Sequence, residues 1–218
     1  MKIVAPEFEI LTPLDPPAIL ARLERAGRTC YLSEGRATEG SAGPFVRSII
    51  SRGHHSVIEH ESLSLRLVCD RGVSHELVRH RLASFSQEST RYVNYGHGPE
   101  GGGLVVVRPL FFEEGSEKYA LWLRAMEAAE AAYLALISAG ATAQEARSVL
   151  PHSLKTELVL TANLREWRHI LALRCGPASH PQMREIMNLV RARFQELLPE
   201  IFGDQSGGLF AITGQEML

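Results

Sequence analysis

Apolar positions repeat along the chain with two different periods, which predicts a mixture of strands and helices. Leu63, Leu65, Leu67 and Cys69 alternate with residues 62, 64, 66 and 68, and this period of two is typical of a strand with one buried face. Further strands are predicted at residues 2–11, 91–95, 104–108 and 158–161.

Helical periodicity dominates the second half of the chain. Helices are predicted at about residues 16–31, 43–52, 75–82, 113–139, 165–174 and 181–202, with a further one beginning after Thr142. Asp15 and Ser74 are expected N-caps, and Thr142 with Glu145 has the spacing of a capping box. Because helices outnumber strands and the strands look antiparallel, the predicted fold is α+β, with an antiparallel or mixed sheet packed against long helices.

Nothing along the chain separates domains. There is no internal repeat and no long Pro/Gly/Ser linker, so a single domain over residues 1–218 is expected. The glycine-rich residues 97–103 are expected to form a mobile loop. No Gly-x-Gly-x-x-Gly follows a predicted strand, so the pattern gives no support to a Rossmann nucleotide site.

Composition narrows the class of protein. The net charge is −2 over 218 residues, which argues against a general nucleic-acid coat, and no apolar run is long enough to span a membrane. The first residues lack the features of a signal peptide. The three cysteines, Cys30, Cys69 and Cys175, fit neither a disulfide framework nor a paired zinc motif. A cytoplasmic protein is therefore expected.

The basic residues are mostly arginine, since only three of the 23 Lys and Arg residues are lysine. Arg79, Arg81 and Arg91 lie in one stretch that also contains several Ser and Thr residues. Guanidinium forks together with hydroxyl donors suit a phosphorylated ligand. On the predicted helix Arg81 falls among apolar residues, so it is expected to reach an anion.

Besides an enzyme that binds a phosphorylated ligand, two other functions are compatible with these residues. A metal-dependent nucleotide phosphohydrolase could use a cluster of possible metal ligands with the arginines as phosphate clamps: His54, His55, Glu59, His60 and Asp70. An RNA- or anion-binding module without catalysis is the third hypothesis.

The arginine-rich stretch also carries an extended motif. Its fixed positions, Arg79-His80-Arg81, Ser84, Ser89 and Arg91, match RHRxxSxxxxSxR in full, a pattern that resembles the signature of the flavin-dependent thymidylate synthases, the ThyX family. The flanking residues agree with the same family: His54, Ser56, Glu59, His60, Arg147 before Val149-Leu150-Pro151, Asn163, Arg165, Arg174 and His180. The Pro-Cys nucleophile of the other class of thymidylate synthase is absent, since His152 follows Pro151.

The resemblance implies an activity and its partners. A ThyX-like enzyme converts dUMP to dTMP, with 5,10-methylenetetrahydrofolate as the one-carbon donor and FADH2 as the hydride source, and NAD(P)H regenerates the reduced flavin. The resemblance also implies a homotetramer, with active sites that lie between subunits. Neither a nucleic acid nor a membrane is an expected partner, and no metal is expected.

The resemblance also implies roles for individual residues. FAD would be bound by Ser56, Arg79, His80, Arg81, Gln87, Asn163, Leu164, Arg165 and His169. The dUMP site would use Glu76, Leu77, Val78, Arg79, Gln87, Glu88, Ser89, Thr90, Arg91, Arg147 and Arg174. Arg174 is the expected catalytic residue, because the matching arginine in the family favours the ionised N3 of the uracil.

Overall fold

The computed structural model describes residues 1–97 and 102–205 of the chain. The strands are β1 (Lys2–Val4), β2 (Glu7–Ile10), β3 (Ser62–Asp70), β4 (Ala83–Gln87), β5 (Val105–Val107) and β6 (Lys155–Asn163). The α-helices are α1 (Pro16–Thr29), α2 (Ala42–Ser51), α3 (Arg71–Leu77), α4 (Glu117–Ser138), α5 (Ala143–Ala146), α6 (Leu164–Arg174), α7 (Pro181–Leu197) and α8 (Pro199–Phe202). Short 3-10 turns are η1 (Glu34–Arg36), η2 (His55–His60), η3 (Tyr95–His97) and η4 (Arg147–Val149).

Four of the strands form one sheet in the order β2-β3-β6-β4, and β1 pairs in parallel with β5 in a second sheet. Contacts between β3 and β6 show that these two strands are antiparallel. Ser64 bonds Thr161 across the pair and Arg66 bonds Glu157, so the residue number rises on one strand as it falls on the other. The described elements therefore confirm the α+β class with an antiparallel and mixed sheet.

The chain divides into two compact units. Unit 1 contains residues 1–9 and 65–160, and unit 2 contains residues 10–64 and 161–218. The strands β3 and β6 contribute residues to both units. The prediction of one domain over residues 1–218 stays a prediction.

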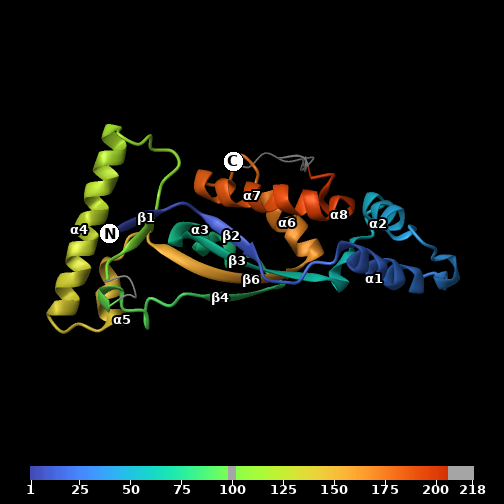
Figure 1. Ribbon diagram of the computed structural model, residues 1–218, viewed down its shortest axis with the longest axis horizontal. Coiled ribbons are helices and arrows are strands. Elements are labelled where there is room, and N and C mark those ends of the chain that lie inside the picture. Colours follow the sequence, from blue (N-terminus) through green and yellow to red (C-terminus); the bar gives the residue numbers. More distant parts are fainter. Residues whose placement is uncertain (98–101, 206–218) are drawn as a thin grey trace, which may run out of the picture. The chain divides into compact units, whose positions relative to one another are not determined.

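Each unit has its own apolar core. In unit 1, α4 packs against α5 and η4 around the buried residues Tyr95, Leu104, Tyr133, Ala146 and Leu154. In unit 2, each helix packs against the next one in the order α6, α7, α8, α2 and α1. Figure 1 shows α6, α7 and α8 in orange to red and α2 and α1 in blue. The aromatic rings of Trp167, Phe194 and Phe202 stack edge-on or tilted within that core.

Elements governed by local chemistry are confirmed. The Asp15 side chain accepts a hydrogen bond from the Ala18 N–H and begins α1, while the Thr142–Glu145 capping box begins α5. The strand predicted from residues 63 to 69 is β3, and its leucines are buried.

Four element predictions are wrong at particular residues. The strand expected over residues 2–11 breaks into β1 and β2 at Pro6, and the helix expected over 181–202 breaks into α7 and α8 at Pro199, because proline lacks the N–H that either element needs. The strand expected at 91–95 is a turn in which the Ser89 carbonyl accepts from the N–H groups of Tyr92 and Val93. The helix expected at 75–82 instead occupies Arg71–Leu77, since Asp70 rather than Ser74 caps it.

Part of the predicted glycine loop, residues 98–101, lies outside the described residues. In the described parts of the chain, no helix combines the length and the apolar character that crossing a membrane requires.

Candidate functional site

The arginine-rich motif of unit 1 follows α3 rather than lying on it. The helix ends at Leu77, so Arg79 and Arg81 lie in the connection to β4, where both are exposed, while His80 is buried. Leu82 adopts φ +63°, a left-handed backbone that is unusual for a leucine. The expectation that Arg81 is placed among apolar residues is therefore wrong, because the helix that would put it there has ended.

The first predicted substrate residues lie on α3 itself and just after it. Glu76 is half-buried, Leu77 is fully buried and Val78 is 41% exposed. Leu77 belongs to the core, so it supports the helix rather than presenting a polar group.

At the end of β4, neighbouring residues are held on opposite sides of the strand. The Gln87 Nε2 donates to Ser74 Oγ at 2.9 Å and to Thr156 Oγ1 at 3.2 Å. The Glu88 carboxylate instead contacts Tyr95 and Lys155. This alternation follows from the period of two along a strand.

The turn after Glu88 presents the remaining predicted substrate residues. Ser89 Oγ accepts from the Arg91 N–H at 3.3 Å, and Thr90 is buried. The Arg91 guanidinium lies 5.5 Å from the centre of the Tyr92 ring, and both side chains are exposed. The local hydrogen bonds thus hold the turn while Arg91 projects from it.

Cations lie around His75 of α3. The pKa of His75 is lowered first by burial and then by the charges of Arg71, His152 and Arg79, which outweigh the opposite effect of Asp70. The guanidinium groups of Arg71 and Arg79 would attract an anion at this end of unit 1. Arg147, in η4 of the same unit, is also exposed.

Unit 2 carries the other predicted ligands, at the start of α6 and in the adjacent η2. The Asn163 side-chain oxygen caps α6 by accepting from the Glu166 N–H at 2.8 Å. Arg165 Nη1 bonds Glu59 of η2 at 2.5 Å, and Ser56 of η2 is exposed. The two elements therefore bring Ser56, Asn163 and Arg165 into one region of unit 2.

Three more predicted residues of α6 differ in burial. Leu164 is fully buried and its N–H donates to the Glu61 carbonyl. His169 is exposed, and Arg174, the last residue of the helix, is half-buried. A cation at this position is favoured by the helix dipole.

The donors of unit 2 fit the diphosphate of a dinucleotide cofactor. A helix N-terminus, an exposed guanidinium and a hydroxyl are the groups that bind phosphate oxygens in proteins. In α6 and η2 these are the first turn of the helix, Arg165 and Ser56.

The alternative metal site finds no support among the described residues. Glu59 is paired with Arg165, and His55 Nε2 lies 3.3 Å from the Ile50 carbonyl oxygen. Within the described ranges, the five candidate ligands do not contain three whose donor atoms are close enough to share an ion. Asp70 is already used to cap α3.

The buried cysteines are poor nucleophiles. Burial raises the pKa of the Cys69 thiol to about 12 and also raises that of Cys175. Cys30 is exposed at the end of α1.

Three residues that surround Glu88 are not predicted from the sequence: Tyr95, Lys155 and Glu157. One signal was available, since Lys155 is one of only three lysines and the spacing of Lys155 and Glu157 places both on one face of a strand.

Comparison with known proteins identifies the family of the chain. The family model described as "Thymidylate synthase complementing protein" (Thy1) matches residues 16–200. The chain is 35% identical to a flavin-dependent thymidylate synthase of Geobacter sulfurreducens, over 92% of this chain and 85% of the relative. It is 36% identical to the same enzyme of Mycolicibacterium gilvum, over 91% and 84% of the two chains.

A solved structure shows the same fold. The UMP/dUMP methylase PolB from Streptomyces cacaoi, bound with 5-Br dUMP, superposes with a TM-score of 0.75 at 24% identity and covers 93% of this chain and 96% of its own. The chain therefore belongs to the family of flavin-dependent thymidylate synthases, and the predicted enzyme class and flavin dependence are confirmed.

Proposed function

We propose that this flavin-dependent thymidylate synthase binds dUMP on the turn that follows β4 and converts it to dTMP, with 5,10-methylenetetrahydrofolate as one-carbon donor and NAD(P)H as the source of reducing equivalents. The observation that carries this proposal is the turn itself, in which Ser89 and local backbone bonds hold the chain while Arg91 projects outward. The charges of Arg71 and Arg79 beside His75 add electrostatic attraction for a nucleotide monophosphate.

The polar residues of the turn and its neighbours bind the nucleotide. Arg91 and Arg147 pair with the phosphate, because a guanidinium fork matches two phosphate oxygens. Ser89 and Gln87 supply uncharged hydrogen bonds, and Arg79 adds a further cation. Binding the phosphate pays part of the entropic cost of placing the uracil ring.

Arg174 is the proposed catalytic residue. A guanidinium supplies a fixed positive charge, which would stabilise negative charge on the uracil N3. Its position at the last residue of α6 fixes it on a rigid element.

FAD is proposed to bind Ser56, Asn163, Arg165 and His169, with Leu164 supporting the start of α6. Arg79, His80, Arg81 and Gln87 are further proposed ligands of FAD. When bound, FAD supplies the hydride chemistry that no side chain can provide. The protein residues bind its phosphates and orient the ring.

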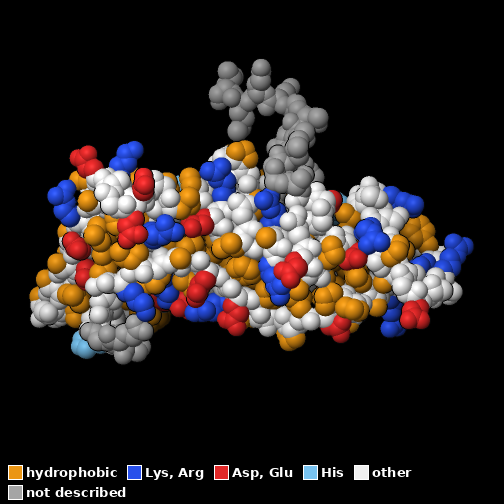
Figure 2. Space-filling model, turned by 45° about the horizontal axis from the view of Figure 1, so that its top comes forward, with side chains coloured by type: hydrophobic (Ala, Val, Ile, Leu, Met, Phe, Trp, Pro, Cys, Tyr) orange, Lys and Arg blue, Asp and Glu red, His pale blue; other side chains and the backbone are white. Residues whose placement is uncertain are grey.

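A homotetramer with active sites between subunits is part of the proposal. The motif segment exposes apolar side chains, since Leu82 is 82% and Tyr92 79% exposed. Hydrophobic side chains also lie among charged ones on the face seen in Figure 2. Exposed apolar groups beside a proposed site support burial by a second copy of the chain. The cytoplasmic location stays a prediction.

The test is direct. Purified protein is examined for the visible absorption of bound flavin and for dTMP formation from dUMP, methylenetetrahydrofolate and NADPH, and its mass in solution is measured by light scattering. Flavin-dependent dTMP formation by a tetramer is the expected result. A flavin-loaded protein that leaves dUMP unchanged would refute the proposed substrate, and a monomer that is active would refute the shared site.

A further inference from the structure

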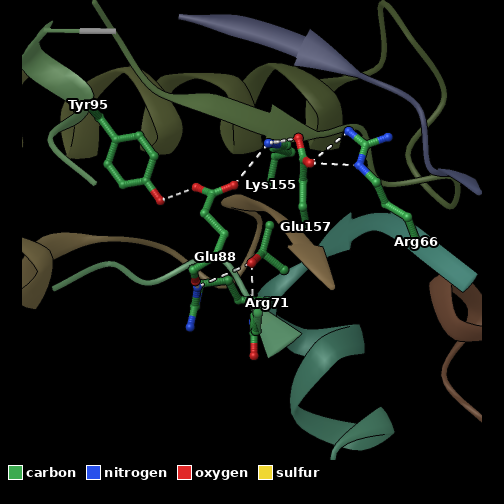
Figure 3. A network of polar contacts seen from close by, with 8 residues as sticks. Arg66, Arg71, Glu88, Tyr95, Lys155 and Glu157 are labelled. Atoms are coloured by element: carbon green, nitrogen blue, oxygen red, sulfur yellow. Dashed lines mark hydrogen bonds and ion pairs between the residues drawn. The ribbon is translucent and has the colours of Figure 1, made fainter. Parts of the chain in front are cut away.

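Five polar side chains form a connected network on the side of β4 opposite Gln87. We call Arg66, Glu88, Tyr95, Lys155 and Glu157 the Glu88 network, and Figure 3 shows how they meet. All five belong to unit 1. Their strands are β3 and β6, and Glu88 is the first residue after β4.

Both carboxylate oxygens of Glu88 are occupied within this network. Tyr95 Oη donates to Glu88 Oε1 at 2.6 Å, and Lys155 Nζ donates to Oε2 at 3.0 Å (Figure 3). The Glu88 backbone is held as well, since its N–H donates to the Glu157 carbonyl at 2.9 Å and its carbonyl accepts from Arg71 at 3.4 Å. Glu88 is thus fixed by its side chain and by its backbone.

Lys155 joins the two halves of the network. Its Nζ also donates to Glu157 Oε1 at 2.6 Å, and Arg66 Nε donates to Glu157 Oε2 at 2.8 Å. Two cations therefore balance two carboxylates, so the network is neutral as a whole and needs no ligand to complete it.

The protonation states reinforce these bonds. Burial would lower the pKa of Lys155, but its bonds to Glu157 and Glu88 outweigh burial and raise that pKa. Burial would raise the pKa of Glu157, but Lys155 and Arg66 outweigh it and lower the pKa. Burial and the bond to Glu88 raise the pKa of Tyr95, so its hydroxyl stays a donor.

The Glu88 network borders a cavity. The network lies in the wall of a cavity of about 880 Å³ that is also lined by residues of β1 and by Gly102 and Gly103. The Glu88 side chain is only 15% exposed, so the bonds from Tyr95 and Lys155 compensate the burial of its charge. Removing one donor leaves one carboxylate oxygen without its partner, and the neighbouring cavity gives the side chain room to turn away.

We propose that Tyr95 and Lys155 are positioning residues that act through Glu88, rather than Glu88 being a ligand of dUMP itself. Gln87 is bonded on one side of the chain and Glu88 on the other, so the backbone enters the Ser89–Arg91 turn in a single orientation. The turn is thereby preorganised to bind the nucleotide, which lowers the entropic cost of binding. This inference rests on the proposed dUMP site.

The test measures dUMP binding and turnover in Tyr95→Phe and Lys155→Met. Each variant removes one donor to Glu88 and keeps most of the side chain. We expect the Kd and the KM for dUMP to rise about tenfold, the size typical of one lost hydrogen bond to a charged group. The kcat at saturating dUMP and the FAD content should change little, because the chemistry and the flavin do not depend on the turn. The melting temperature should fall in both variants, because each leaves the largely buried Glu88 carboxylate without one of its donors.

Conservative and matched variants sharpen the result. Lys155→Arg keeps a cation that can reach both carboxylates, so its dUMP affinity should stay within about threefold of the wild type. Arg193→Met removes one cation from an exposed pair with Glu196 on α7 and should change nothing. In a double-mutant cycle, Lys155→Met combined with Glu88→Gln should be clearly less harmful than the sum of the single changes.

The proposal and the underlying site fail in different ways. If the wild type bound no dUMP, the proposed function would be wrong. If the wild type is active but Tyr95→Phe and Lys155→Met bind dUMP as tightly as it does, only the positioning role is refuted. An equal loss of FAD affinity and of dUMP affinity would also refute it, because the network would then support the fold in general.

Discussion

Two arginines on the same helix of unit 2 have opposite surroundings. Arg165 is at the first turn of α6, its side chain is 53% exposed, and it makes one bond to Glu59. Arg168, one turn later, has a side chain that is only 7% exposed. It bonds both carboxylate oxygens of Asp204 at 2.6 and 2.8 Å and also the Ile201 carbonyl.

The difference separates a structural arginine from one that can bind a ligand. The donors of Arg168 are used to attach the segment after α8 to α6, and Gln205 strengthens this attachment by donating to the Arg168 carbonyl at 2.8 Å. About half of the Arg165 side chain is exposed to solvent, and its one bond is to the partly exposed Glu59. Arg174 ends the same helix in an intermediate environment. Residue type alone therefore does not reveal function on this helix.

The largest effect is expected at Arg174. Arg174→Ala removes the charge proposed to stabilise the uracil anion and should lower the rate of dTMP formation by at least about a hundredfold. Bound FAD, measured by absorption, should be retained. Arg174→Lys keeps a positive charge, so its rate of dTMP formation should lie between those of the wild type and Arg174→Ala. Full activity of Arg174→Ala would place Arg174 with the structural arginines.

The next largest effect concerns Arg168. Arg168→Met removes a buried bidentate pair and a bond to a carbonyl, so the free energy of unfolding should fall by about 2 kcal/mol. Urea denaturation measures this change, and Arg193→Met, which breaks an exposed pair, should stay within about 0.5 kcal/mol of the wild type. Equal stabilities of the two variants would contradict the structural role of Arg168.

Arg165→Gln, unlike Arg168→Met, should weaken FAD binding and leave stability nearly unchanged. Its pair with Glu59 is exposed, so unfolding should change by less than about 0.5 kcal/mol. FAD affinity, measured by titrating the flavin-free protein, should fall about tenfold because a charged donor to phosphate is lost. Unchanged FAD affinity would remove Arg165 from the proposed site.

The smallest expected effect is a pH dependence of the stability that the Arg168–Asp204 pair contributes. Its hydrogen bonds lower the pKa of Asp204 below the ordinary value of 3.8, so the stabilisation is fully present above pH 3.8 and is lost as the pH falls through the folded-state pKa. The stability difference between wild type and Arg168→Met should therefore narrow in acid. The difference between wild type and Arg165→Gln should show no such narrowing from Asp204.

Local signals predicted much of the fold. The caps at Asp15 and at Thr142–Glu145 act within four residues, so the sequence alone locates the starts of α1 and α5. Pro6 and Pro199 carry equally local information that the periodicity of their neighbours obscured. The strand β4 was missed because its short, serine-rich segment pairs with β6, about 70 residues further along the chain.

In the candidate site, too, the local sequence predicts some features and long-range pairing decides others. The motif from Arg79 to Arg91 identifies the family, and the comparisons confirm it. The motif does not show that Glu88 faces Tyr95 and Lys155 while Gln87 faces Ser74. That depends on the strand pairing of β4 with β6.

By itself, the sequence determined the starts of α1 and α5, the main buried strand and the family, because each depends on residues that are close along the chain or on a contiguous motif. Tertiary structure alone decided which charged side chains are free to meet a ligand. Arg168 is occupied by a carboxylate 36 residues away, and Glu88 by a lysine 67 residues away. Such pairings arise only when the chain has folded, since burial and electrostatic partners are properties of position in space.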